Sequence, residues 1–140
     1  MPTSLPSEPL APTPTASPYE RCGGEAGIRF LTRRFYEVMD SLPEGKAARA
    51  LHPPSLHAVE RKLFEYLSGW LGGPQLFVER YGPPMLRRRH LHAPIGPEAV
   101  QSWLFCFHRA WQETIEDKAI GDEVLPQIEA LAHHMRNILT

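Results

Sequence analysis

The feature that most limits the fold of this chain is an irregular stretch that separates two pairs of helical patterns. It runs from Pro74 to Gly96 and includes Gly82-Pro83-Pro84 and Pro94. Proline and glycine interrupt helices, so any helix inside the stretch must be short. A plain helical bundle does not need an irregular insert of about 20 residues, because its connections are usually much shorter. The stretch therefore favours a helical domain that wraps around a flat bound group.

Apolar residues spaced three and four positions apart predict four amphipathic helices, two on each side of this stretch. The stripes lie at residues 28–38, 59–70, 100–111 and 124–138. Pro43 should end the first helix, and Pro97 suits the first position of the third helix, where its missing N–H is not needed. The fourth helix is expected to start near Asp122, with Pro126 within its first turn or so. Since no strand-like alternation of useful length is present, the sequence predicts an all-α fold.

Length and composition indicate one domain with a tail in front of it. The chain has 140 residues, enough for a single core. Residues 1–17 are rich in Pro, Ser, Thr and Ala and are expected to form a flexible extension, which leaves 18–140 as the folded domain.

Charge and hydropathy argue against a nucleic-acid partner and against a membrane partner. With 15 basic and 16 acidic residues, the chain has no bias toward nucleic acid or an anionic membrane. It also has neither a membrane-length apolar run nor an export signal, so a cytoplasmic location is expected. Cys22 and Cys106 are then expected to be free thiols.

Among the seven histidines, His90 has the most suggestive setting. No HExxH motif and no repeated Glu-x-x-His pair is present, so a zinc or di-iron site has weak support. A haem site needs fewer protein ligands than a zinc or di-iron site: one neutral imidazole on the iron, an apolar slot for the ring and cations near the propionates. His90 follows Arg87-Arg88-Arg89 and precedes the break at Pro94. From these residues alone, a solvated histidine in a basic patch remains the stronger interpretation.

Four motifs favour the haem-ligand interpretation of His90 over the solvated one. They are Phe35-Tyr36, Trp70-Leu71-Gly72-Gly73-Pro74, Arg87-Arg88-Arg89-His90 and Trp103-Leu104-Phe105-Cys106. In these motifs, over residues 19–137, the chain resembles the truncated haemoglobins of the second group. The resemblance implies a two-over-two helical sandwich around haem b, with His90 as the only protein ligand of the iron. His92 is the one nearby competitor.

The resemblance also implies roles for side chains around the cofactor. On the distal side, where the gas binds, it implies polar groups from Tyr36, His52 and Trp103 and an apolar wall from Val59 and Leu63. Around the cofactor itself it implies contacts from Lys62, Leu63, Tyr81, Arg87, Arg89 and Trp103. The ordinary alternatives are a core tryptophan and solvated surface charges.

The implied function is reversible binding of O₂, CO or NO at a pentacoordinate iron. Hydrogen bonds to a charged acceptor contribute about 1.5–3 kcal/mol each, so three distal donors would give tight O₂ binding. One alternative is a peroxidase or NO dioxygenase, which would need a partner reductase. Another is a helical interaction or sensor domain without haem. No nucleic-acid or membrane partner is expected, and the chain could be a monomer or a homodimer.

Overall fold

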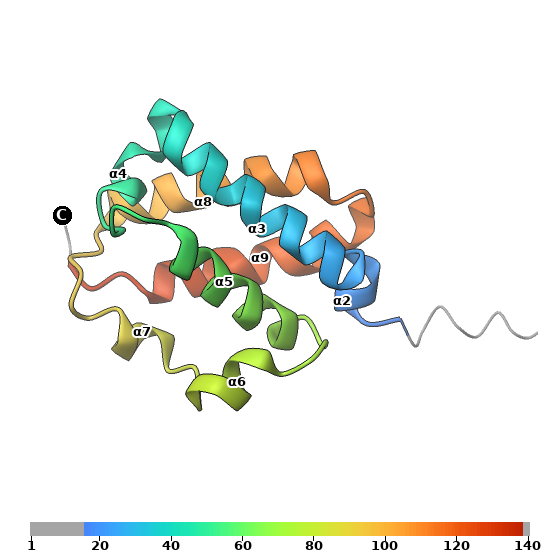
Figure 1. The fold of residues 1–140 in the computed structure, drawn as a ribbon. Coiled ribbons are helices and arrows are strands. Elements are labelled where there is room, and N and C mark those ends of the chain that lie inside the picture. Colours follow the sequence, from blue (N-terminus) through green and yellow to red (C-terminus); the bar gives the residue numbers. More distant parts are fainter. Residues whose placement is uncertain (1–15, 139–140) are drawn as a thin grey trace, which may run out of the picture.

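The computed structural model describes residues 16–138, and all regular structure within that range is helical (Figure 1). The all-α prediction is therefore confirmed, while the flexible tail predicted for residues 1–17 lies almost wholly outside the described residues. The elements in chain order are α2 (Pro18–Arg21), α3 (Gly24–Ser41), the 3₁₀ turn η2 (Pro43–Gly45), α4 (Lys46–Arg49), α5 (His57–Trp70), α6 (Leu76–Tyr81), α7 (Leu86–Arg89), α8 (Pro97–Thr114) and α9 (Lys118–His134).

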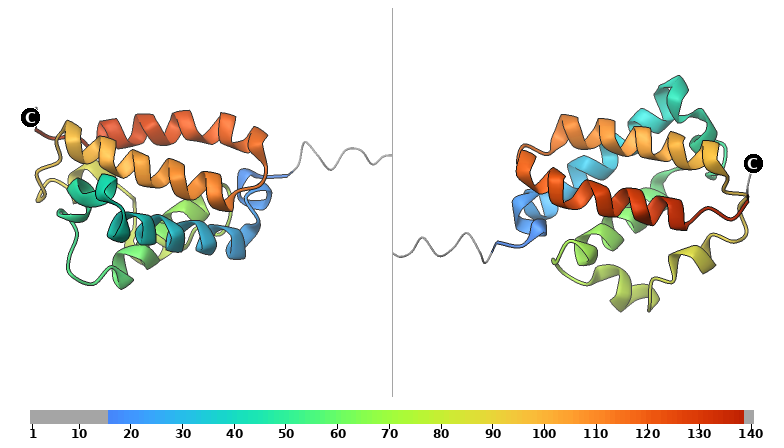
Figure 2. Two further views of the ribbon diagram at one scale, coloured as in Figure 1. Left: turned by 90° about the horizontal axis from the view of Figure 1, so that it is seen from above. Right: turned by 180° about the vertical axis from the view of Figure 1, so that it is seen from behind.

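The four long helices form two layers. The pair α3 and α5 packs against the pair α8 and α9, as the two views in Figure 2 show. The largest of the fully buried side chains are Phe35 of α3 and Phe107 of α8, whose ring centroids lie 5.7 Å apart. The predicted stripes thus face one core, and α8 begins at Pro97 as expected.

The Ser102 side chain fixes the short helix α4 against α8. Its hydroxyl donates to the carbonyl of Glu44 at 2.7 Å and accepts from the N–H of Ala48 at 3.1 Å. Gly45 sits so close to the backbone of Met39 that an added Cβ would lie 2.7 Å from the Met39 Cα. The tight turn places the residues after α4, including His52, at a defined point beside α8.

The irregular stretch contains only short helices, as predicted. They are α6, of 6 residues, and α7, of 4 residues. Met85 precedes α7 in the left-handed region, with φ of 42°, a conformation that a non-glycine side chain rarely adopts. Figure 1 shows this segment passing beneath α5 and rising to the start of α8.

The expected start of the last helix was wrong. Helix α9 begins at Lys118, four residues before Asp122, and Pro126 lies inside it. The side chain of Asp117 explains the early start, because it accepts from the N–H of Ile120 at 3.1 Å and caps the first turn. Arg21 holds that carboxylate at 3.0 Å, which also lowers the pKa of Asp117 through the hydrogen bond.

Both cysteines are free and buried, in agreement with the sequence analysis. Burial raises the pKa of each thiol to about 11, so Cys22 and Cys106 are protonated at neutral pH. Within residues 16–138, no helix is long and apolar enough to cross a membrane.

We expect Pro126→Ala to raise the free energy of unfolding by about 1–2 kcal/mol. Alanine restores an N–H for the carbonyl of Asp122 and relieves the ring clash, while losing some of proline's restriction of the unfolded chain. Pro126 is exposed, so little packing is lost. Urea denaturation measures the change. Pro54→Ala, at an exposed position outside any helix, is the control and should give no gain; destabilisation by Pro126→Ala would contradict this account.

Candidate functional site

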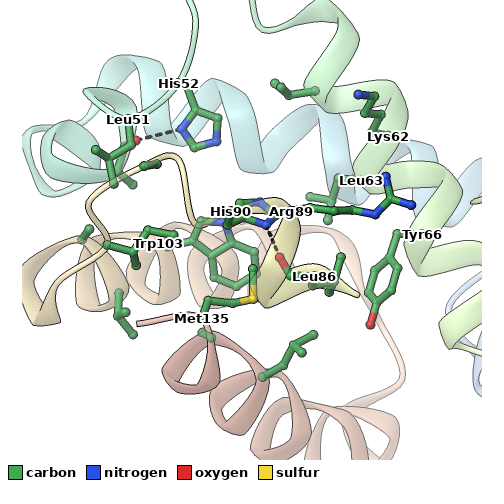
Figure 3. Close-up of a pocket in the computed structure, with 18 of the residues that line it drawn as sticks. Leu51, His52, Lys62, Leu63, Tyr66, Leu86, Arg89, His90, Trp103 and Met135 are labelled. Carbon is green, nitrogen blue, oxygen red and sulfur yellow. Dashed lines mark hydrogen bonds between the residues drawn. The ribbon is translucent and has the colours of Figure 1, made fainter. Parts of the chain in front are cut away.

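A cavity of about 910 Å³ lies between the irregular segment and the long helices. Its volume is at the upper end of the usual range for cofactor pockets, about 300–1,000 Å³. Apolar side chains from three helices form much of its wall, including Leu63 of α5, Val100 of α8 and Met135 following α9. Figure 3 shows this space with polar groups concentrated at a few points of its border.

His90 borders the cavity directly after α7. Its Nδ1 lies 2.7 Å from the carbonyl oxygen of Leu86, one helical turn earlier. A carbonyl oxygen can only accept, so Nδ1 carries the proton of the neutral ring and Nε2 keeps its lone pair. This is the tautomer that a metal-binding imidazole needs, and the hydrogen bond also fixes the ring orientation. His92 lines the same cavity.

His52 has the same arrangement on another wall of the cavity (Figure 3). Its Nδ1 lies 2.8 Å from the carbonyl oxygen of Ala48, so its Nε2 is also an acceptor in the neutral ring. Burial is the main cause that lowers its pKa, and the charges of Arg49 and His90 act in the same direction. The neutral ring therefore has no N–H to offer in the cavity, which changes the role implied for it by the sequence.

Tyr36 and Trp103 bring an O–H and an N–H to the cavity. Tyr36 is 6% exposed, and burial raises the pKa of its phenol far above the usual value, so the hydroxyl keeps its proton. Its ring meets that of His52 edge-on, with centroids 5.7 Å apart. The indole of Trp103 is held between Phe35, at 5.0 Å, and a stacked Phe107, at 5.2 Å. Both donors are thus fixed by aromatic packing.

The rim of the cavity carries charged groups with different partners. Lys62 is exposed and its Nζ lies 5.4 Å from the ring centre of Tyr81. The Tyr81 hydroxyl donates at 2.9 Å to Glu65, a buried carboxylate that also pairs with Arg80 at 3.1 Å. Lys62 is therefore the rim cation most open to an anionic ligand.

Arg89 also borders the cavity, but its guanidinium contacts the backbone. It donates to the carbonyl oxygens of Pro84 at 2.6 Å and of Tyr81 and Pro83, both at 2.9 Å. These bonds hold the loop between α6 and α7. Arg87 is exposed and is not among the residues that line the cavity.

All the other predicted site residues border this one cavity: Tyr36, His52, Val59, Lys62, Leu63, Tyr81, Arg89, His90 and Trp103. Sequence reasoning missed the contribution of the last helix, whose lining residues are Ile128, Leu131, Ala132 and Met135. Three of those four belong to the predicted apolar stripe, but a stripe does not reveal whether it faces a solid core or a cavity.

The chain was compared with known proteins. Residues 17–137 match the family model of the bacterial-like globins. The chain is 36% identical over 121 residues to the group 2 truncated hemoglobin YjbI of Bacillus subtilis. This alignment covers 86% of this chain and 89% of that protein. It is 52% identical to the group II 2-on-2 hemoglobin of Agrobacterium tumefaciens, with a TM-score of 0.85 over 86% of this chain and 94% of that one. A truncated oxygen-avid haemoglobin structure from Bacillus subtilis matches with 36% identity and a TM-score of 0.78, covering 86% of this chain and 99% of that one.

We expect the pKa of His52 to lie below its ordinary value of 6.5 and its neutral ring to carry the proton on Nδ1. As the pH falls through that lowered pKa, Nε2 gains a proton and becomes a donor to the cavity. Nitrogen-15 NMR of the His52 imidazole, recorded in a diamagnetic form of the protein over a range of pH, reports both the tautomer and the midpoint of the titration. A neutral ring protonated on Nε2 would overturn this assignment.

Proposed function

This chain belongs to the bacterial-like globins and is a group II truncated haemoglobin. From this assignment we propose that it binds O₂ tightly and reversibly at a pentacoordinate haem. Haem b is the cofactor of the family, and haem-based gas binding is its general property. The fold is the two-over-two sandwich of these proteins. The sequence-based alternative of a helical interaction domain without a cofactor loses its support.

The residues around the cavity fit haem b. The cavity combines apolar walls, an imidazole with a free Nε2 and, at its edge, the exposed cation Lys62. Within the described part of the chain, neither the Tyr36 hydroxyl nor the Trp103 indole has a protein acceptor, although both groups line the cavity. Buried donors normally have partners, so these two groups are suited to a bound ligand.

The observation that carries the proposal is the hydrogen bond from His90 Nδ1 to the Leu86 carbonyl. When bound, haem b supplies a ferrous iron that takes O₂, CO or NO. His90 would be its one protein ligand and Lys62 would pair with a propionate; Arg87 and Arg89 remain weaker candidates for that pairing. We assign Val59 and Leu63 to the apolar wall of the gas site, where they would exclude water.

Tight O₂ binding follows from the two distal donors. The Trp103 indole can only donate, so no neighbour can turn it into an acceptor. The Tyr36 hydroxyl can both donate and accept, and its ring lies edge-on to that of His52, with centroids 5.7 Å apart. Trp103 is therefore the principal donor. The oxygen-avid character named for the related Bacillus subtilis structure supports this view. A cytoplasmic location stays a prediction.

His90→Ala should abolish stable haem retention, because the iron loses its only protein ligand. His92→Ala is the matched control and should leave the absorption spectrum nearly unchanged, although His92 lines the same cavity. The visible spectra of the purified variants, ferric, ferrous and with CO, give the answer. A normal spectrum in the His90 variant together with haem loss in the His92 variant would refute the assignment.

Trp103→Phe should speed O₂ dissociation by about one to two orders of magnitude, the equivalent of one hydrogen bond to a charged acceptor. Tyr36→Phe should have a smaller effect, because a hydroxyl can accept as well as donate and is therefore not an obligatory donor to the gas. Stopped-flow release of O₂ measures both rates.

Trp111→Phe provides the matched control for this experiment. It makes the same change on the same helix, in a side chain stacked on Phe107 but absent from the cavity lining. Its O₂ dissociation rate should match that of the wild type. Equal acceleration in the Trp103 and Trp111 variants, or none in the Trp103 variant, would contradict the proposal.

A further inference from the structure

We infer that Asn137, just beyond the end of α9, is a positioning residue that holds His90 in place for the iron. The inference rests on the proposed role of His90 as the haem ligand. Asn137 does not line the cavity, and among the described residues its side chain makes no hydrogen bond to the imidazole ring. It acts through the backbone of the segment that carries the histidine.

Helix α7 cannot fix the position of His90 by itself. It has 4 residues, and a single helical turn is unstable in isolation because its nucleation cost is barely offset by its few hydrogen bonds. The guanidinium of Arg89, the last residue of this helix, reaches back to the carbonyls of Tyr81, Pro83 and Pro84 and ties the helix to the loop before it. Its exit, where His90 lies, needs a comparable anchor.

Asn137 supplies that anchor with every part of its side-chain amide. Its Oδ1 accepts from the N–H of Ile95 at 2.9 Å. Its Nδ2 donates to the carbonyl oxygen of Ala93 at 2.9 Å and, more weakly, to that of His90 at 3.4 Å. Only an amide side chain offers one acceptor and two donors at once. The three bonds also fix which end of the amide is oxygen.

The main chain strengthens the same contact. The N–H of Asn137 donates to the carbonyl of Ile95 at 2.8 Å, and the N–H of Ile138 donates to it at 3.2 Å. The His90 carbonyl, in addition, accepts from the N–H of Ala93 at 3.0 Å. The turn after His90 is thus closed on itself and tied to the end of α9.

This tie matters because Ile128 of α9 and Met135, which directly follows the helix, form part of the cavity wall. Asn137 therefore fixes His90 relative to the wall against which a haem ring would pack. The Leu86 carbonyl sets the orientation of the imidazole, while Asn137 sets the position of the backbone that carries it. Loss of the amide leaves the orientation bond intact and lets the segment shift.

Resonance Raman spectroscopy of the ferrous, gas-free holoprotein tests this role, because the iron–histidine stretching band reports the geometry of that bond. Asn137→Ala should shift and broaden the band. It should also speed haem loss to an excess of apomyoglobin by about tenfold, the equivalent of one ordinary hydrogen bond. Asn137→Asp keeps the acceptor for Ile95 but loses both donors, so it should shift the band as well.

Gln75→Ala is the matched control. The Gln75 amide also ties a loop, donating to the carbonyls of Gly69 at 3.0 Å and Gly73 at 3.3 Å, but it is not connected to His90. This variant should leave the band unchanged, whatever its effect on the melting temperature. The same shift in the Gln75 variant would mean general loosening and would overturn the inference.

The outcomes separate the inference from the proposed function. If the wild type shows an iron–histidine band that His90→Ala removes, the proposed ligand stands. Unchanged bands and haem-loss rates in both Asn137 variants then overturn the positioning role alone. If the wild type shows no such band, both fall together. Should Asn137→Ala fail to fold, Asn137→Asp decides the question, with circular dichroism as the check on its fold.

Discussion

The hydrogen bond between His90 Nδ1 and the Leu86 carbonyl is the interaction on which the account of this site depends. It decides which ring nitrogen keeps its lone pair, and therefore that the imidazole would bind iron through Nε2. The bond is local, joining residues one turn apart, but the turn that makes it is too short to be stable alone. Two side chains supply the missing rigidity: Arg89 ties the turn to the loop before it, and Asn137 ties the residues after it to the end of α9.

The same chemistry at His52 gives a different consequence. Its ring also donates Nδ1–H to a carbonyl one turn earlier, so the cavity receives an acceptor rather than a third donor. Burial keeps that ring neutral by lowering its pKa. In the gas site we propose, Trp103 would therefore be able only to donate, whereas the Tyr36 hydroxyl would be able to donate or accept. Gas binding in this protein should depend on pH through His52 only on the acid side of neutrality.

Much of this fold could be predicted because helical periodicity and proline positions are local signals. The start of α8 at Pro97 and the short helices of the irregular stretch follow from them. The predicted start of α9 is wrong because that prediction places Pro126 within about the first turn, whereas the capping Asp117 lies nine residues before this proline. That cap was readable in the sequence as an aspartate just before a helical stripe.

The residues of the candidate site were predictable in part, whereas their hydrogen bonding was not. Family motifs identified His90 and Trp103, yet the tautomer of His52 and the bonds of Arg89 depend on carbonyl groups that only the folded backbone positions. Asn137 carries no motif, because its role arises from a contact across 47 positions of the chain, and no local pattern marks such a contact.

The most direct test of the central claim is chemical rescue of the proximal ligand. His90→Gly removes the imidazole and leaves space for a free one, so the absorption spectrum of this variant can be followed with and without added imidazole. The account predicts that the variant alone lacks a normal ferrous haem spectrum and that imidazole restores it. A wild-type spectrum without imidazole would show that another residue binds the iron and would contradict the account.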